Sequence, residues 1–438
     1  VQTNYAYDCD GNISHLETRT ESAVLLSFDY QYDGNGNRTA KTGIQGLTAG
    51  SSALDIRYQY DVRGQLLEEC RNGAAVRYAY DAAGNRIRKT EGEKETRYRY
   101  NQKNQLLHEE KADGIKRFTY DRQGGIVEEQ GTGGIRRYTY NSRHQQTQVE
   151  TETGSIQKNR YDSEGLRYEL LENGRRTSFV YHKGELLYER GGETERSQGE
   201  TSYHLSAGIE ALERIGQTFY YHQDEQLNTA FLSDGTAALK NQYQYDAFGV
   251  SLESLEEFPN RIRYTGQQYD QLTGQYYLRA RYYNPVLGRF MQEDVYQGDG
   301  LNLYAYCRNN PVMYYDPSGY ACGGTGEIAG DGGENNFRSK YNAGELYESH
   351  IIYNEHRIDA IAEIEIHKDR LILKDMAMYS NEGDIPNQIG IGALSKWLKD
   401  VKNQARSQGF RELQIIAQRA EHSTSANPGH VIDKIYIL

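Results

Sequence analysis

Residues 418–433 gather side chains that can act as acid, base and phosphate ligand. The stretch QRAEHSTSANPGHVID follows a short apolar run and contains, in chain order, Arg419, His422, Ser423, Thr424, Ser425, Asn427, His430 and Asp433. Histidine exchanges protons near neutral pH, and arginine binds phosphate through its planar fork of donors. This composition at a strand end predicts an RNase or another nucleotide-directed enzyme. The alternative is that these residues only form a polar loop.

A glycine loop upstream could bind a different anion. NQIGIGAL places Asn387, Gly390 and Gly392 immediately before a segment with helical spacing. Glycines let the backbone amides of a helix N-terminus approach a pyrophosphate, and the helix dipole favours the anion. The alternative is that Gly390 and Gly392 simply allow a tight turn between a strand and a helix, since a single loop of this kind is a weak motif.

The dense, non-repeating stretch NPVLGRFMQEDVYQGDGLNLYAYCRNNPVMYYDPSGY at 284–320 contains several carboxylates, among them Asp294 and Asp316, and it also contains Arg289. Two carboxylates that share one proton can activate a water molecule and protonate a leaving group. The structural alternative is that both aspartates cap turns.

The composition limits the fold that positions these residues. Hydrophobic residues make up 37% of the 438 residues and the net charge is −12, but 39 tyrosines argue against disorder. Together with 45 glycines they indicate many short strands joined by glycine turns. No stretch reaches the roughly 18 apolar residues of a membrane span. Four scattered cysteines without a CxxC pair argue against a zinc site, and the acidic balance gives no support to nucleic-acid binding by the whole chain.

A short unit repeats along the first half of the chain. It reads aromatic-x-Tyr-Asp/Asn followed by a turn, as in YQYDVRGQLLEE at 58–69 and YAYDAAGNRIRKT at 78–90, and five copies begin at 58, 78, 98, 118 and 138. Each copy predicts strand, turn and strand. Because a lone hairpin cannot bury its apolar face, the hairpins must join into one continuous sheet.

These Tyr-Asp steps resemble the YD repeats of the Rhs family. The segment at 220–249 is similar to the late repeats of that family, with a glycine missing near Asn228. The resemblance implies a mostly β fold in which a hairpin sheet spirals into a hollow shell. Periodicity alone supports an ordinary solenoid or sandwich equally well.

The dense stretch resembles the conserved end of the Rhs core, through RARYYNPVLGRFMQED, NLYAYCRNNP and DPSGY. It departs from the family at Val295 and Tyr320. The resemblance implies that Asp294 and Asp316 act as an aspartic-protease-like pair, with Arg289 orienting or polarising. The implied cut lies between Tyr320 and Ala321.

The residues after 320 predict a small α/β domain behind a glycine-rich linker at 321–340. Strands are expected at 358–367, 370–379, 412–418 and 431–438, and a helix at 391–410, in the order β-β-α-β-β. This order and the glycine loop resemble the acetyl-CoA-binding core of GNAT acetyltransferases, which implies acetyl-CoA as a possible cofactor at Asn387, Gly390 and Gly392. The stretch at 418–433 keeps the nuclease or an ADP-ribosyltransferase-like enzyme as alternatives.

The sequence therefore predicts four parts: a repeat shell at 1–283, a plug and self-cleavage motif at 284–320, the linker at 321–340, and an effector at 341–438. Since Val1 falls within a repeat, we expect the C-terminal piece of a longer chain. The Rhs resemblance implies a polymorphic toxin that is secreted or delivered from a cell surface, works with a secretion machinery, is neutralised by an immunity protein, and acts in the cytoplasm of a target cell. The alternative is a non-enzymatic surface recognition module.

Overall fold

The chain forms two compact units, Val1–Gly333 and Glu334–Leu438. A computed structural model describes residues 1–21, 23–46, 53–182, 184–191, 199–205, 208–295, 302–324, 346–353, 356–367, 370–380, 398, 401–402, 405, 410–418 and 431–437. In this part of the chain no helix is long and apolar enough to cross a membrane.

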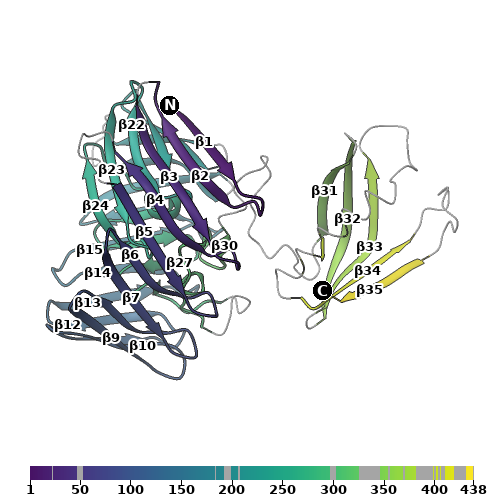
Figure 1. Ribbon diagram of the computed structural model, residues 1–438. Helices are drawn as coiled ribbons and strands as arrows, with labels where there is room; N and C mark the ends of the chain where they lie inside the picture. The colour runs from purple at the N-terminus through teal and green to yellow at the C-terminus, as the bar shows by residue number, and fades with distance from the viewer. Residues whose placement is uncertain are drawn as a thin grey trace. The chain divides into compact units, whose positions relative to one another are not determined.

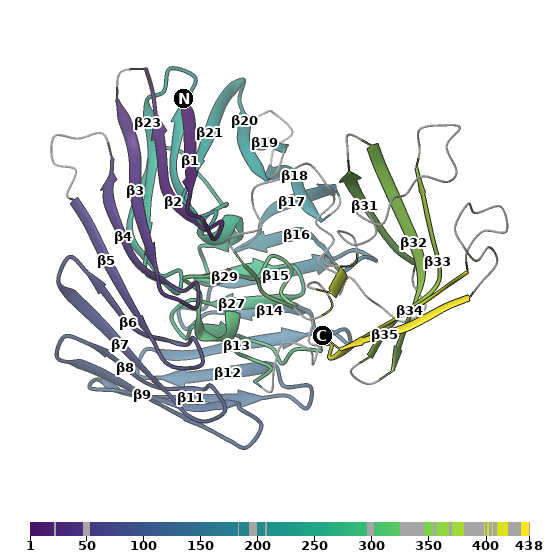
Figure 2. The same ribbon diagram turned by 45° about the vertical axis from the view of Figure 1, so that its right-hand side comes forward.

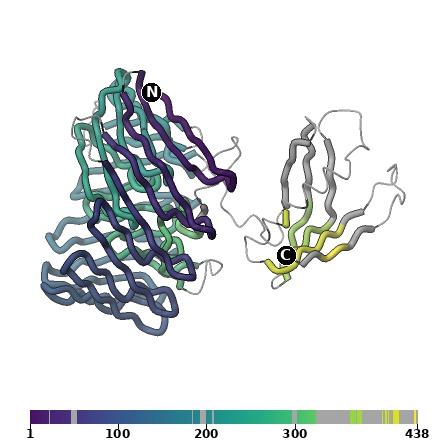
Figure 3. Tube along the Cα trace, in the orientation of Figure 1, coloured from purple at the N-terminus to yellow at the C-terminus, as the bar shows by residue number. Residues whose placement is uncertain are grey.

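The first unit is built on one antiparallel sheet of 24 strands (Figure 1). Each strand pairs with the next one along the chain, so the trace is a continuous series of hairpins (Figure 3). The strands are β1 (Gln2–Tyr7), β2 (Ile13–Arg19), β3 (Val24–Tyr32), β4 (Arg38–Gln45), β5 (Ala53–Tyr60), β6 (Leu66–Arg71), β7 (Ala74–Tyr80), β8 (Arg86–Glu91), β9 (Lys94–Tyr100), β10 (Leu106–Lys111), β11 (Gly114–Tyr120), β12 (Ile126–Gly131), β13 (Gly134–Tyr140), β14 (Gln146–Glu150), β15 (Ile156–Tyr161), β16 (Arg167–Glu172), β17 (Arg175–His182), β18 (Glu185–Gly191), β19 (Glu200–Leu205), β20 (Ile209–Arg214), β21 (Gln217–Gln223), β22 (Thr229–Asp234), β23 (Leu239–Tyr245) and β24 (Ser251–Glu256). The predicted hairpin sheet is confirmed.

The two aromatic positions of each repeat have different tasks. The first ring is buried on one face of the sheet, as at Tyr78, which is 4% exposed. The second tyrosine donates its hydroxyl to a backbone carbonyl of the preceding hairpin, for example from Tyr80 to Leu66 O at 2.9 Å and from Tyr100 to Arg86 O at 2.9 Å. Tyrosine is therefore favoured over phenylalanine at the second position, because each hydroxyl ties one hairpin to the last.

The acidic residue after the tyrosine pair builds the turn. Asp81 Oδ1 accepts hydrogen bonds from the amides of Ala83 and Asn85, both at 2.9 Å, and Gly84 takes a positive φ of 77°. Glycine suits this position because other residues are strained there. In the late repeat, Leu227 takes the same conformation at φ 60°, so that turn forms without the expected glycine.

The sheet curves around the last part of the first unit, residues 260–295 and 302–324, which we call the inner segment (Figure 2). It contains 3-10 turns η1 (Tyr264–Gly266) and η2 (Cys307–Asn309), a four-stranded sheet of β25 (Gln268–Asp270), β26 (Gln275–Leu278), β27 (Arg281–Asn284) and β28 (Arg289–Phe290), and the pair β29 (Tyr314–Tyr315) and β30 (Gly323–Gly324).

Amide side chains fix the inner segment to the turns of two hairpins, β3–β4 and β7–β8. Asn310 Nδ2 donates to Asn37 Oδ1 at 3.0 Å, and Asn309 Nδ2 donates to Gly84 O at 2.7 Å. At the start of the predicted linker, Gly323 and Gly324 form β30 and pair with β29.

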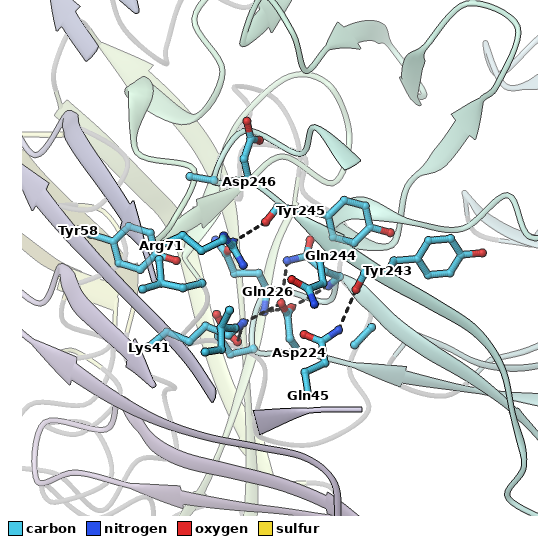
Figure 4. A pocket seen from close by; sticks show the side chains of 16 residues that line it. Lys41, Gln45, Tyr58, Arg71, Asp224, Gln226, Tyr243, Gln244, Tyr245 and Asp246 are labelled. Atoms are coloured by element: carbon cyan, nitrogen blue, oxygen red, sulfur yellow. Dashed lines mark hydrogen bonds and ion pairs between the residues drawn. The ribbon is translucent and has the colours of Figure 1, made fainter. Parts of the chain in front are cut away.

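The curvature brings early strands against late ones, around a polar cavity of about 40 Å³ (Figure 4). Lys41 Nζ on β4 lies 3.0 Å from Asp224 and 2.9 Å from Glu225, and Arg38 Nη1 lies 2.6 Å from Glu225. Glu225 is also bonded by the Tyr30 hydroxyl at 2.6 Å and is 3% exposed. A buried ion network thus joins the two ends of the curved sheet.

The pKa of Glu225 predicts how this junction responds to acid. Burial alone raises the pKa, but the charges of Lys41 and Arg38 and the hydrogen bonds from Lys41 and Tyr30 outweigh it and lower the pKa to about 2. A depressed pKa stabilises the fold above the unfolded value and loses that effect as pH falls. We expect the free energy of unfolding to decline between pH 4.5 and about 2, and this decline to be weaker in Glu225→Gln. Denaturant titrations at several pH values in that range test this expectation. An identical decline of the free energy of unfolding with pH in both proteins would contradict it.

Asp246, also at this cavity, predicts the opposite trend near neutral pH. Burial and the charge of Glu69 raise its pKa to about 7 against the opposing charges of Lys89 and Arg86. The unfolded chain loses this proton near pH 4, so stability falls as pH rises from about 4 to 7. We expect Asp246→Asn to be more stable than wild type at pH 8, by a few kcal/mol at about 1.4 kcal/mol per pKa unit, with no difference below pH 4.

Asparagine keeps the oxygen that accepts the Phe248 and Val250 amides at 3.0 and 2.8 Å, so the turn itself is preserved. Asp81→Asn, at the same position of an earlier turn, is the matched control. If the free energies of unfolding of wild type and Asp246→Asn differ by the same amount at every pH, the titration of Asp246 does not cause the difference.

The second unit is a five-stranded sheet of β31 (Leu346–Tyr353), β32 (His356–His367), β33 (Arg370–Ser380), β34 (Glu412–Gln418) and β35 (Val431–Ile437). Its neighbours are antiparallel except for β33 and β34, which are parallel. Ala362 and Ile364 are buried, as the alternating pattern predicts. The strand β31 was not predicted. Among the described residues of the predicted helix at 391–410, Leu398, Val401, Lys402 and Ala405 are helical and Phe410 is not.

Candidate functional site

The predicted cleavage motif lies in a tight loop between β29 and β30. Tyr315 pairs with Gly323, so the chain reverses over the seven residues between them. Asp316 Oδ1 accepts hydrogen bonds from the amides of Ser318 at 3.0 Å and Gly319 at 2.7 Å. Asp316 therefore caps a turn, which is the structural alternative that the sequence analysis considered for it.

Gly319 fits this turn because no side chain can. Its φ is +78°, and a Cβ would lie 2.4 Å from Leu278 O and 2.9 Å from Arg281 N. Both obstacles are backbone atoms of the hairpin β26–β27, which cannot move aside. The glycine of the DPSGY motif thus lets the loop lie directly on that hairpin.

Arg281 on β27 brings the two predicted carboxylates together. Its Nη2 lies 2.8 Å from Asp294 Oδ2 and 3.7 Å from Asp316 Oδ2. Asp294 and Asp316 are 7% and 1% exposed, and Arg281 is 6% exposed. One buried guanidinium nitrogen thus contacts both carboxylates and offsets their mutual repulsion.

The same arginine also holds the chain just ahead of the predicted cut. Arg281 Nε donates to Gly319 O, and its guanidinium lies over the Phe290 ring at 3.6 Å. The next residue, Tyr320, is 42% exposed. The carboxylates are therefore buried, while the residue on the N-terminal side of the predicted cut is open to water.

A second arginine fixes the loop from the other side. Arg279 Nη1 donates to Pro317 O, and Arg279 Nε donates to Gly184 O at 2.8 Å. The loop is thereby attached to the hairpin β17–β18.

The structure places Arg289 away from the two carboxylates, contrary to its predicted role. Its Nη2 donates to Asn104 O at 2.6 Å, and its guanidinium packs against the rings of Tyr100 and Tyr304, each at 4.9 Å. Arg281 occupies the position expected for Arg289. Sequence reasoning missed Arg281, which lies three residues before the dense stretch, because alternation along RARYYN can point it to either face of the strand.

Most of the predicted effector residues lie outside the described part of the chain. These are Asn387, Gly390, Gly392, Arg419, His422, Ser425, Asn427 and His430. Asp433 lies on β35, opposite Ile416 of β34. Among the described residues no cluster of His, Cys, Asp or Glu is arranged to hold a metal ion.

The first unit is thus a hairpin-built β-shell with an inner segment that carries a buried carboxylate pair. The Teneurin YD-shell family matches residues 42–314, more than half of the chain, and the chain belongs to that family.

Curated relatives are similar over parts of the chain. The tRNA3(Ser)-specific nuclease WapA of Bacillus spizizenii is 37% identical over 171 residues, which cover 37% of this chain and 7% of that protein. Toxin subunit YenC1 of Yersinia entomophaga is 32% identical over 154 residues, or 32% of this chain and 16% of that protein. Toxin protein Tse5 of Pseudomonas aeruginosa is 36% identical over 101 residues, or 23% of this chain and 8% of that protein. The chain spans less than a fifth of the length of these relatives.

A crystal structure described as TcdB2-TccC3-TEV aligns over 72% of this chain and 20% of its own, with 17% identity and a TM-score of 0.49.

Proposed function

We propose that this chain is the processed carrier of a polymorphic toxin, in which the YD-shell cuts itself between Tyr320 and Ala321 and holds the freed effector. The observation that carries this proposal is the contact of Asp294 and Asp316 with one nitrogen of Arg281, in the turn that leads to that bond. The toxin names of two relatives, YenC1 and Tse5, support the assignment.

The cut requires one water molecule. One carboxylate takes a proton from the water molecule, and the oxygen of that water attacks the carbonyl carbon of Tyr320. The other carboxyl group donates a proton to the nitrogen of Ala321. The C–N bond breaks and leaves a carboxylate on Tyr320 and an amine on Ala321. Arg281 positions both acids and the Gly319 carbonyl. It takes the role first expected of Arg289.

Retention of the effector is tested by comparing native and denaturing separations of the purified chain. We expect one peak in native size-exclusion chromatography and two bands on a denaturing gel. Two separate native peaks would contradict a carrier that holds its cargo after the cut.

The first candidate for the effector is an acyltransferase, and the geometry of the second unit is compatible with it. The parallel strands β33 and β34 pair only from Arg370 to Leu373 and from Glu412 to Ile415, although both strands continue further (Figures 1 and 2). The resemblance to the GNAT core rests on the element order and on the glycine loop, in which acetyl-CoA would be held by Asn387, Gly390 and Gly392. The mixed order of the sheet is compatible with that resemblance.

A nuclease is the second candidate, supported by the WapA relatives that are named as tRNA nucleases. His422 and His430 would then exchange protons, Arg419 would bind phosphate, and Ser425, Asn427 and Asp433 would contact the RNA. In either case we propose secretion or surface delivery, a cognate immunity protein, and action in the cytoplasm of the target cell.

One pair of assays separates the candidates. The full chain is incubated with total tRNA and, separately, with labelled acetyl-CoA. Loss of intact tRNA that disappears in His422→Ala and His430→Ala would establish the nuclease. Binding of acetyl-CoA that disappears in Gly392→Val would establish the acyltransferase. If neither activity is found, the non-enzymatic recognition module would be favoured.

A further inference from the structure

The outer face of four neighbouring strands carries four arginines and one histidine that lie opposite one another in register. Arg88 on β8 pairs in register with Arg97 on β9, Arg99 on β9 with His108 on β10, and His108 with Arg117 on β11. We call these five residues the arginine face. Its four arginines are exposed, and neighbouring strands lie about 4.8 Å apart.

Like charges directly opposite each other on a sheet destabilise it. Elsewhere on the outer face the arginines have acidic partners: Arg77 lies 2.6 Å from Glu68, Arg137 lies 3.2 Å from Glu128, and Arg57 lies 3.2 Å from Asp55. In the arginine face, by contrast, arginines lie opposite another arginine or a histidine.

Within the arginine face only Arg97 has an ion pair, with Glu95, among the described residues. The side chains of Arg88, Arg99 and Arg117 form no ion pair or hydrogen bond with another described residue. Three guanidinium groups are therefore available to a ligand on one side of the sheet, where β8, β9 and β11 run together (Figure 2).

The surroundings of the arginine face suit a protein more than a phosphate polymer. Ile87 and Ile115 lie beside it and are each 40% exposed. Glu95 and Glu110 lie among the arginines, with Glu110 opposite Arg97, and these carboxylates would repel a continuous run of phosphates. Protein interfaces are enriched in arginine and depleted in lysine, and they combine apolar contacts with charged ones.

We propose that the arginine face is a docking surface for an acidic segment of a partner protein, whose carboxylates pair with Arg88, Arg99 and Arg117. The planar fork of each guanidinium matches a carboxylate bidentately. Ile87 and Ile115 provide apolar contacts at the margin of the surface. The interaction is independent of the cleavage loop and of the effector's chemistry.

The test compares two triple variants of the full chain that lose the same charge. The face variant is Arg88→Gln/Arg99→Gln/Arg117→Gln, and the control is Arg57→Gln/Arg77→Gln/Arg137→Gln. The probe is a labelled glutamate-rich peptide of about 20 residues, followed by fluorescence anisotropy at low salt, where charge pairs are least screened. We expect wild type and control to bind alike, and the face variant to bind about tenfold more weakly or worse.

Equal affinities in all three proteins, equal weakening in both variants, or no binding by wild type would each overturn the proposal. Tighter binding of a polyphosphate of equal charge, with the same dependence on the three arginines, would overturn it in favour of a phosphate polymer. The melting temperature is a second measurement. We expect the face variant to melt no lower than wild type, because it loses the like-charge contact of Arg88 with Arg97. A lower melting temperature would contradict this expectation.

Discussion

An Asp316→Asn chain is expected to remain uncut under conditions in which the wild type is fully cut. Asparagine keeps the side-chain oxygen that accepts the Ser318 and Gly319 amides, so the turn is preserved while the second acid is lost. General acid–base catalysis contributes about 10²–10⁴ in rate, and we expect a slowing of at least that order. The measurement is the fraction of full-length chain over time on a denaturing gel.

Asp294→Asn should have the same effect, and Arg281→Lys should slow the cut more mildly. Lysine keeps one charge near the carboxylates but cannot reach Asp294 and Gly319 O through two separate nitrogens. Asp234→Asn, in an exposed turn of the late repeat, is the control and should cut at the wild-type rate. Normal cutting by Asp316→Asn would show that Asp316 only caps the turn.

An Asp270→Asn chain is expected to lose about 3–5 kcal/mol of stability, because it leaves a buried arginine without its counterion. Both side chains of the Arg167–Asp270 pair are 0% exposed. Arg167 Nη2 lies 3.0 Å from Asp270 Oδ1, and Arg167 Nη1 donates to the Tyr282 hydroxyl at 3.0 Å. The pair joins β16 of the shell to β25 of the inner segment, and denaturant unfolding measures the loss.

The control for this prediction is Asp55→Asn, which breaks an exposed pair with Arg57 and should change stability by less than about 1 kcal/mol. Since β25 belongs to the same small sheet as β27, which carries Arg281, we also expect Asp270→Asn to slow self-cleavage. Unchanged stability in Asp270→Asn would show that hydrogen bonds alone hold Arg167 in place.

The hairpin sheet could be predicted because the residues within each repeat determine the local structure of that repeat. The buried ring at Tyr78, the hydroxyl contact of Tyr80 and the turn cap of Asp81 all follow from types and spacing within one copy. The meeting of early and late strands could not be predicted in this way. Lys41 and Glu225 are far apart in the sequence, and no periodicity links them.

The sequence predicted the two carboxylates of the candidate site but not the arginine that contacts them. Asp294 and Asp316 were singled out by the resemblance of their motifs to the end of the Rhs core, whereas Arg279, Arg281 and Arg289 are alike in sequence. Only the pairing of β27 with its neighbours decides which of the three reaches the acids. In the second unit, β31 was missed because its sequence LYESHIIY alternates only weakly.

The central claim is most directly tested by the intact mass of the purified wild-type chain under denaturing conditions, beside Asp316→Asn. The claim predicts two wild-type species whose masses correspond to residues 1–320 and 321–438, and one full-length species in the variant. A single uncut wild-type chain would contradict self-cleavage, and a cut at any other bond would contradict the role assigned to the Asp316 turn.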